Sequence, residues 1–473
     1  MIPITLRDVA MLTGGSLHPD AGTAADIVVD GPVVTDSREA GPGSLYVARV
    51  GEHADGHAYA GSARDRGAVA ALSSRAVEEL PGVVVDDVQT AFGRVARGVV
   101  DRATDLTVVA VTGSSGKTST KDLLAQVLGS AGPTVAPVNS LNGEIGVPLT
   151  VCRVTSETRF LVAEMGARGI GHLAYLTTIA PPDVAIVLNV GVAHVGEFGS
   201  REAVAQAKGE LVEALRPQGL AVLNADDPNV AKMRSRTQAR VVTVGTSVDA
   251  DIRAVDVRLD ALGRAAFTVA AATGRAEVRL LVSGAHQVGN ALAVVAAALE
   301  CGMDLDAVAS ALSAARSTSR WRMEVHERPD GVTVVNDAYN ANPDSMHAAL
   351  EALRAIGHGS EAPRRTWAVL GEMLELGPDT DAAHRLVGAR AAVRADRLIV
   401  VGRGAAGIAE GAIASGMDPR SVDIVADRAA ALDLLLSVAR PTDTILLKAS
   451  RGGALDELVD PLVRAGSLSS TPS

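Results

Sequence analysis

Residues 111–120, VTGSSGKTST, have the residue types of a phosphate-binding loop. Glycines, a lysine and a hydroxyl residue follow one another as in the nucleotide-binding pattern G-x-x-x-x-G-K-[ST], but Val111 stands where that pattern has its first glycine. Gly113 and Gly116 would let the backbone approach a ligand, Lys117 would neutralise phosphate charge and Thr118 would ligate Mg²⁺. The alternative is a serine-rich strand-to-helix turn with a solvated lysine. The residues expected to contact ATP here are Thr112, Gly113, Ser114, Ser115, Gly116, Lys117, Thr118 and Ser119.

The surroundings of this loop favour a nucleotide site. The apolar run 106–111, LTVVAV, is typical of a buried parallel strand, and residues 117–128 have a helical pattern. Further apolar strands end just before Glu164 and before Asn189 and His194. Because open parallel sheets bind ligands at the carboxyl ends of their strands, we expect Glu164 and His194 to meet the loop and bind a divalent ion. The alternative for each is a structural polar residue.

These residues belong to the second of three expected domains, the number that 473 residues suggest. Residues 1–104 carry short strands and turns and predict a small α/β domain. In 105–315 buried strands alternate with helices, which predicts a doubly wound, mainly parallel sheet. A third alternation in 316–465 predicts another α/β domain, and the polar tail 466–473 is expected to be disordered.

The composition limits the possible partners and compartments. Asp and Glu number 55 against 44 Lys and Arg, a net charge of −11, so the basic footprint of a nucleic-acid-binding protein is missing. Cys152 and Cys301 lack metal-ligand spacing and predict buried apolar residues rather than a disulfide framework. The sequence has no apolar run of membrane-spanning length and no signal-peptide pattern at its start. We therefore expect a cytoplasmic protein, and a local basic pocket for an anionic small molecule stays open.

Segments along nearly the whole chain resemble the Mur ligases of peptidoglycan synthesis. In chain order they are VTGSSGKTST, NSLNGEIGVPLT, EMGARGIGHLAYL, AHVGEFGSREAVAQAKGE, GAHQVGNALA, WRMEV, VVNDAYNANPDSM and VLGEMLELG. The stretch DSREAGPGSLYVARVGEHADGHAYAGSARDRGA looks like the UDP-binding N-terminal domain of that family. The resemblance implies an α/β protein with a UDP-sugar-binding domain, a central P-loop ATPase domain and a C-terminal Rossmann-like domain. The family's loop is G-x-x-G-K-[ST], which accounts for Val111.

Within the family, NDAYNANPDSM and LGEMLELG look most like the member that adds the last amino-acid unit. The implied substrates are ATP, UDP-N-acetylmuramoyl-tripeptide and D-alanyl-D-alanine. ATP would phosphorylate the free carboxylate of the tripeptide, and the dipeptide amine would attack the acyl phosphate. Since every substrate is anionic, positioning and charge neutralisation would carry the catalysis.

The resemblance also assigns metal and catalytic roles. Lys117 and Thr118 would contact the γ-phosphate and the first of two Mg²⁺ ions, and Glu164 and His194 would be further magnesium ligands. Lys208 matches a lysine that is carbamylated in this family. Without the resemblance, Lys208 would be an ordinary exposed helix lysine.

Further nucleotide contacts follow from the same resemblance. Asn290 matches the adenine contact of the family, although Gln287 stands where the pattern usually has asparagine. Arg322 matches an arginine near the γ-phosphate, preceded here by Trp321 where the family often has glycine. Asp337 matches a carboxylate that contacts ribose. Closure of the C-terminal domain would bring Arg322 and Asp337 to ATP.

Substrate contacts are expected in all three domains. Arg38 in DSR suits a diphosphate because of its forked guanidinium. The alternative for the asparagines of YNANP is local turn formation before a proline. The residues assigned to substrate binding are Ser37, Arg38, Asp55, His57, Asn139, Asn142, Asn340 and Asn342, with Lys448, Ser450 and Arg451 near the substrate face of the C-terminal domain.

Other functions stay open at this point. A sister ligase adding a different amino acid lacks support because no D-N-P-R-like motif occurs in the C-terminal region. A folylpolyglutamate synthase relative would lack the UDP-type domain. A nucleotide-dependent regulator would be expected to lose Glu164, His194 and Lys208, which are present. A monomer is the state that the resemblance implies.

Overall fold

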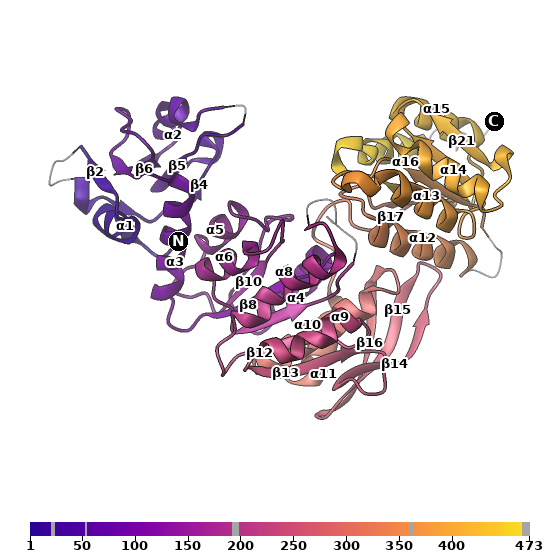
Figure 1. Ribbon diagram of the computed structural model, residues 1–473, viewed down its shortest axis with the longest axis horizontal. Helices are drawn as coiled ribbons and strands as arrows, with labels where there is room; N and C mark the ends of the chain where they lie inside the picture. The colour runs from indigo at the N-terminus through magenta and orange to yellow at the C-terminus, as the bar shows by residue number, and fades with distance from the viewer. Residues whose placement is uncertain (20–23, 53, 192–197, 360–363, 466–473) are drawn as a thin grey trace.

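The computed structural model describes residues 1–19, 24–52, 54–191, 198–359 and 364–465. They form three lobes in chain order, and the first and third lobes lie at opposite ends of the central one (Figure 1). Each lobe is built on its own main sheet. The predicted α/β class is thereby confirmed, while the predicted domain limits stay a prediction and the tail 466–473 lies outside the described residues.

The N-terminal lobe is a small twisted sheet with short helices. In sheet order its strands are β2 (Ser16–His18), β7 (Gly82–Val84), β6 (Ala68–Ser73), β5 (Ser44–Ala48) and β4 (Val33–Val34). A separate pair is formed by β1 (Ile4–Thr5) and β3 (Val28–Val29), and the helices are α1 (Leu6–Thr13), α2 (Ala60–Asp65) and α3 (Val88–Arg102). Helix α3 packs on helices of the central lobe, and one hydrophobic cluster runs through both lobes. The first lobe is therefore joined to the second by a shared core.

The central lobe is a nine-stranded sheet, parallel except for its last hairpin. In sheet order its strands are β16 (Gly274–Ser283), β15 (Arg264–Ala271), β14 (Ile252–Leu259), β13 (Arg240–Gly245), β12 (Leu220–Asn224), β11 (Val184–Val187), β8 (Thr107–Thr112), β10 (Phe160–Glu164) and β9 (Thr134–Val135). Its helices are α4 (Lys117–Gly129), α5 (Gly146–Val151), α6 (His172–Ile179), α8 (Arg201–Glu213), α9 (Pro228–Ala231), α10 (Gln287–Glu300) and α11 (Leu305–Ala314).

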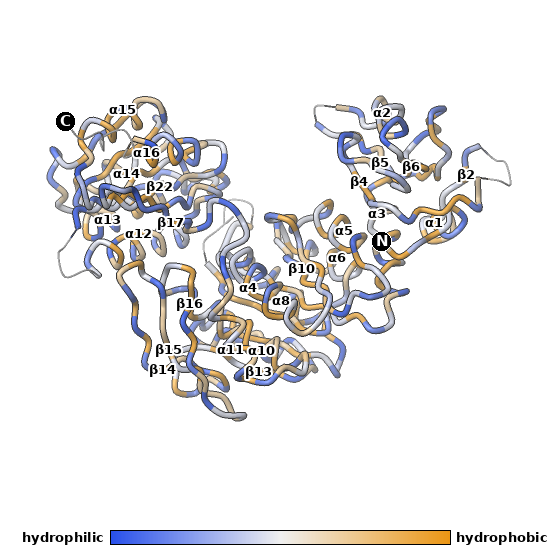
Figure 2. Tube along the Cα trace, turned by 180° about the vertical axis from the view of Figure 1, so that it is seen from behind, coloured by the Kyte–Doolittle hydropathy of each residue, from blue (hydrophilic) through white to orange (hydrophobic). Residues whose placement is uncertain are grey.

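Strand β8 shows why this sheet is buried on both faces. Its side chains alternate with the two-residue period of a strand: Val108 and Ala110 join one hydrophobic cluster, and Val109 and Val111 join the other. The first cluster includes α5, α6 and α8, and the second includes α4, α10 and α11. Figure 2 shows hydrophobic residues along β10 and α10, with hydrophilic residues on outer turns. Apolar residues on both faces explain the unbroken run LTVVAV.

The C-terminal lobe has a six-stranded sheet with one antiparallel edge strand. In sheet order its strands are β17 (Glu324–Glu327), β18 (Thr333–Asn336), β22 (Thr444–Lys448), β19 (Thr366–Leu370), β20 (Arg397–Val401) and β21 (Val422–Val425). Its helices are α12 (Pro343–His358), α13 (Thr380–Ala391), α14 (Ala406–Ala414), α15 (Arg428–Val438) and α16 (Val459–Ala465). The clusters on its two faces contain α12, α13 and α14 on one side and α15 and α16 on the other.

Two expectations from composition can be compared with this fold. Cys152 is buried, Cys301 is half-buried, and both are free thiols whose pKa burial raises to about 12. Among the described residues, no helix is both long and apolar enough to cross a membrane.

Candidate active site

The phosphate loop lies where β8 ends and α4 begins, at the carboxyl edge of the central sheet. Gly116 has φ 83°, and a Cβ there would come within 2.7 Å of Asn290 Oδ1. Asn189 follows β11 and fastens the loop, since its side chain accepts from Ser115 N at 2.9 Å and donates to Ser115 O at 3.1 Å. The glycine is therefore required by conformation and space, and Asn189 holds the loop instead of facing a metal.

Glu164 ends β10, the strand beside β8, and lies completely buried behind the loop. Its Oε1 accepts from Ser140 Oγ at 2.6 Å, Asn142 Nδ2 at 2.8 Å and Thr118 Oγ1 at 3.2 Å. Its Oε2 is buried with no hydrogen-bond partner in the described structure. A buried carboxylate oxygen without a donor is costly unless something positive binds it. The chemistry of this corner fits a cation next to Thr118.

Two lysines approach the loop, the half-buried Lys117 and the buried Lys208. Lys117 Nζ donates to Gly113 O at 2.5 Å; burial lowers the pKa of Lys117, and Glu164 opposes that change. Lys208 on α8 is 3% exposed and lines the same cavity. Burial, followed by the charge of Lys117, holds the pKa of Lys208 well below its usual value. Within the described part of the chain no hydrogen bond or ion pair of Lys208 occurs, so its amine is available for reaction.

The segment that enters the C-terminal lobe is anchored on the phosphate-loop helix. Asp122 on α4 is buried, and its Oδ2 accepts from Ser319 N at 2.8 Å and Thr318 N at 3.2 Å. Lys121 pairs with Asp122 at 2.5 Å and donates to Ser319 Oγ at 3.0 Å. This buried ion pair fixes the chain at Ser319, three residues before Arg322. The sequence patterns did not indicate this anchor.

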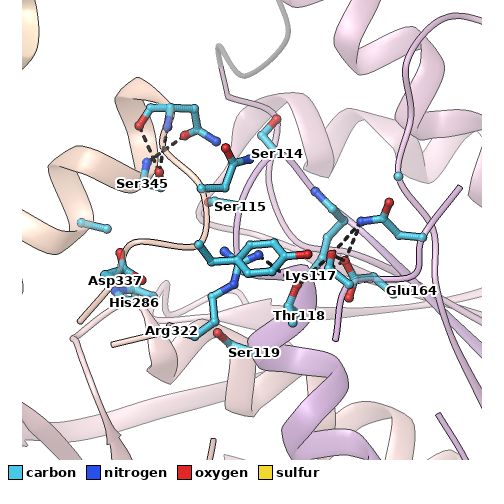
Figure 3. A pocket seen from close by; sticks show the side chains of 18 of the residues that line it. Ser114, Ser115, Lys117, Thr118, Ser119, Glu164, His286, Arg322, Asp337 and Ser345 are labelled. Carbon is cyan, nitrogen blue, oxygen red and sulfur yellow. Dashed lines mark hydrogen bonds between the residues drawn. The ribbon is translucent and has the colours of Figure 1, made fainter. Parts of the chain in front are cut away.

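Arg322 reaches across from that segment to the loop (Figure 3). Its Nη2 donates to Thr118 Oγ1 at 3.3 Å, and its guanidinium lies 4.2 Å from the centre of the Tyr339 ring. A cation stacked on an aromatic face is attracted to it. The structure therefore brings Arg322 and Thr118 together although 204 positions separate them.

Asp337 follows β18, Lys448 ends the neighbouring strand β22, and the two side chains form a buried pair. Asp337 Oδ2 lies 2.5 Å from Lys448 Nζ, and Asp337 Oδ1 accepts from Met323 N at 3.2 Å. Lys448 also donates to Asn340 O at 2.9 Å. Asp337 thus stabilises the segment that carries Arg322, and it also lines the cavity.

A cavity of about 290 Å³ joins these groups, with walls from the central and C-terminal lobes. Besides the residues already described it contains Arg168 and His172. The predicted residues that line it are Ser114, Ser115, Gly116, Lys117, Thr118, Ser119, Asn142, Glu164, Lys208, Arg322, Asp337, Asn340, Asn342 and Lys448.

A second cavity of about 270 Å³ lies behind the loop, between the strand ends and the start of α10. Asn290 lines it and donates to Gln287 Oε1 at 2.9 Å, so the residue that replaces the usual asparagine braces Asn290. His286 lines both cavities. Gly116 lies on the same wall, which makes this cavity continuous with the phosphate loop.

Several predicted residues lie elsewhere or have local roles. Asn139 is exposed with φ 55° and is not in the cavity wall, whereas Ser140 beside it is. Asn342 caps α12 by accepting from Ser345 N at 2.9 Å, and Asn340 Oδ1 accepts from Ala341 N. The turn-forming alternative therefore holds for the side-chain oxygen of both asparagines. Because both residues line the cavity, their side-chain NH₂ groups could still donate to a ligand. Thr112 and Gly113 are also predicted residues, but they do not line the cavity. The predicted residue His194 lies outside the described residues.

The N-terminal residues make contacts with one another. Arg38 is exposed and pairs with Asp36, whose pKa it lowers to about 2. His57 is buried, with Nδ1 2.6 Å from Asp55 Oδ1 and Nε2 near Ser74, and Arg75 pairs with Asp55 at 2.6 Å. Ser37 is buried at the start of a 3₁₀ turn. None of the four predicted residues Ser37, Arg38, Asp55 and His57 is in the walls of the two cavities, and their lobe stands apart from the third (Figure 1).

Comparisons with known proteins agree with this arrangement along the chain. Family models match residues 32–107 (Mur ligase family, catalytic domain), 111–298 (Mur ligase middle domain) and 321–451 (Mur ligase, glutamate ligase domain). A UDP-N-acetylmuramoyl-tripeptide--D-alanyl-D-alanine ligase of Mycobacterium tuberculosis is 47% identical, and the alignment covers 98% of each chain. The protein of that name from Escherichia coli is 35% identical, over 98% of this chain and all of the relative.

Solved structures show the same similarity. MurF from Acinetobacter baumannii superposes with a TM-score of 0.87 at 29% identity, over 98% of this chain and 99% of that one. A MurF ligase from Thermotoga maritima in complex with ADP has a TM-score of 0.80 at 28% identity, over 93% and 99%. Similarity thus extends over all three lobes.

Proposed function

The chain belongs to the Mur ligase family, and we propose that it joins D-alanyl-D-alanine to UDP-N-acetylmuramoyl-tripeptide with ATP, releasing ADP and phosphate. The observation that carries this proposal is the contact of Arg322 with Thr118, which brings the C-terminal lobe to the phosphate loop in a chain 47% identical to such a ligase. Peptidoglycan synthesis is the process that this reaction serves.

The reaction has two transfers, and the chain supplies charge and position to both. An oxygen of the tripeptide carboxylate attacks the γ-phosphorus, and ADP leaves. The dipeptide nitrogen then attacks the acyl carbon, loses a proton and forms the amide, and phosphate leaves. The α4 N-terminus and Lys117 would hold phosphate oxygens. Arg322 would stabilise charge that develops at the γ-phosphate.

Magnesium fits the corner formed by Thr118 and Glu164. The unpartnered Glu164 Oε2 and the Thr118 hydroxyl are hard oxygen donors of the kind that Mg²⁺ prefers. The described residues contain no group of three His, Cys, Asp or Glu side chains able to hold a metal. Nucleotide phosphates and water would therefore complete the coordination, with His194 as a further proposed ligand. Bound there, Mg²⁺ would neutralise phosphate charge.

A carbamate on Lys208 fits its surroundings. An uncharged amine can attack CO₂ at carbon and release a proton, and burial favours the uncharged form of Lys208. The product would be an anion facing the two cations Lys117 and Mg²⁺. Mass spectrometry in bicarbonate buffer, with a gain of the mass of CO₂ that Lys208→Met lacks, would support this modification.

The adenine and the UDP group would occupy opposite ends of the site. The cavity beside Asn290 continues from the phosphate loop and would take adenine, with Asp337 near the ribose. Ser37, Arg38, Asp55 and His57 would meet the UDP group in the N-terminal lobe. We further propose that the enzyme is a cytoplasmic monomer, which cell fractionation and sedimentation would check.

The direct test is phosphate release by the purified protein with ATP and Mg²⁺. UDP-N-acetylmuramoyl-tripeptide and D-alanyl-D-alanine are supplied together and then omitted in turn. Release that requires both substrates supports the proposal. Release that requires the UDP-tripeptide but another amine would contradict the dipeptide assignment and indicate a sister reaction.

A further inference from the structure

Two aromatic rings, those of Trp321 and the cavity-lining Tyr339, pack together in a chain with only two tryptophans and four tyrosines. The Trp321 and Tyr339 rings are 6.3 Å apart at 35°, and Tyr339 N donates to Trp321 O at 3.3 Å. Trp321 and Met323 have φ 61° and 50°, in the left-handed region that non-glycine residues avoid. Ring packing and the Asp337 bond to Met323 hold this segment in that conformation.

Two arginines share this pair of rings. Arg322 is engaged on the phosphate side with Thr118. Arg451 lies three residues after the end of β22. Its guanidinium is 6.0 Å from the centre of the Trp321 ring and 5.8 Å from the centre of the Tyr339 ring. Arg451 is exposed. In the part of the chain that the structure describes, its guanidinium lies near two aromatic rings and has no carboxylate partner within ion-pair distance.

The other cations near the cavity are differently placed. Lys448 is paired with Asp337, and Lys117 is bonded within the loop. Arg168 is exposed and forms no ion pair within the described residues, but it precedes α6, which packs on α3 of the N-terminal lobe. A substrate that extends from the N-terminal lobe would pass Arg168, whereas Arg451 belongs to the C-terminal lobe, beside the ring of Tyr339 that lines the cavity.

We propose that Arg451 binds the carboxylate of the incoming dipeptide, with the Trp321–Tyr339 pair holding its guanidinium in place. This assignment rests on the proposed function. The dipeptide brings one amine that must reach the acyl phosphate and one carboxylate that does not react, and its two residues span about 7 Å. Arg322 marks the phosphate end through its contact with Thr118, and Arg451 lies near the same pair of rings without a contact to the loop among the described residues. A guanidinium matches a carboxylate with two hydrogen bonds, and stacking reduces the entropy lost in forming them.

The test compares D-alanyl-D-alanine with its C-terminal amide, which lacks the negative charge. Steady-state rates are measured at saturating ATP and UDP-tripeptide for wild type, Arg451→Ala, Arg451→Lys and Arg168→Ala. Arg390→Ala, an exposed arginine on α13, is the matched control. In Arg451→Ala we expect kcat/KM for the acid to fall about tenfold to a hundredfold, the size of one charged hydrogen-bonded contact.

The same variant should use the amide within about twofold of wild type, since wild type gains nothing from Arg451 with a neutral substrate. Unchanged use of the amide also shows that the variant is folded. Arg451→Lys should recover part of the loss, and Arg390→Ala should match wild type. If kcat/KM of Arg451→Ala fell equally for the acid and the amide, the assignment would be overturned. It would also be overturned if Arg168→Ala lost the preference for the acid while Arg451→Ala kept it. A wild type that does not use the dipeptide would overturn the proposed function itself.

Discussion

Substitution of Gly116 by alanine tests whether the short loop is a preformed phosphate site. The residue has φ 83°, and alanine pays roughly 1–2 kcal/mol in the left-handed region. Its Cβ would also lie 2.7 Å from Asn290 Oδ1. Asn290 is buried and bonded to Gln287, so it cannot move aside freely.

These two effects together predict a cost of about 2 kcal/mol or more for the binding-competent loop. If the loop relieves the strain by opening, the cost appears in ATP binding, where about 2 kcal/mol corresponds to about a thirtyfold higher Kd. Isothermal titration calorimetry with ATP and Mg²⁺ measures this directly, alongside thermal unfolding.

Gly129→Ala is the matched control, at the other end of the same helix. A Cβ at Gly129 meets nothing within 4 Å, and alanine favours a helix over glycine by roughly 0.5–1 kcal/mol. This variant should bind ATP within about twofold of wild type and be at least as stable. Wild-type affinity in Gly116→Ala would refute the argument from loop conformation.

Three further predictions concern side chains of the cavity. Tyr339→Leu removes the ring that stacks on Arg322; since such a cation–π contact contributes about 0.5–2 kcal/mol, kcat at saturating substrates should fall by up to about thirtyfold. Tyr339→Phe keeps the ring and should stay within about twofold of wild type. Equal losses of kcat in the two variants would contradict the stacking role. Because burial lowers the pKa of Lys208 below 10.5, the unfolded chain binds a proton there that the folded chain does not, and wild-type stability rises with pH between the two pKa values. Lys208→Met should therefore be inactive yet harder to unfold than wild type at neutral pH in carbonate-free buffer, and a gap that did not narrow toward alkaline pH would contradict this. Glu164→Gln should weaken the Mg²⁺ dependence of ATP binding about tenfold or more but leave binding without Mg²⁺ unchanged; loss of both would indicate a distorted loop.

The strands and the loop could be predicted because their signals are local. The run LTVVAV became β8 since its residues alternate between two buried faces, and the helical pattern of residues 117–128 became α4.

The partners of the site residues were harder to predict. The Arg322 contact with Thr118, the ring of Tyr339 below it and the Asp122 anchor depend on packing between lobes, which no local pattern encodes. Ser140 illustrates the same limit, since only the fold shows that it, and not its neighbour Asn139, faces Glu164.

Residue type alone also does not separate binding from structural roles. Asn342 has the right chemistry for a substrate amide but uses its carbonyl to cap α12. Asp55 and His57 satisfy each other and their neighbours in the N-terminal lobe. Their assignment to UDP stays a prediction, which substitution of Arg38 and a KM for the UDP-tripeptide would examine.

The central claim, ligation through an acyl phosphate, is tested most directly by oxygen transfer. UDP-N-acetylmuramoyl-tripeptide labelled with ¹⁸O in its reacting carboxylate is incubated with ATP, Mg²⁺ and D-alanyl-D-alanine, and the released phosphate is analysed by mass spectrometry. The account predicts one ¹⁸O atom in each phosphate and a product heavier by the dipeptide. Phosphate without the label, released together with that product, would contradict the acyl-phosphate route.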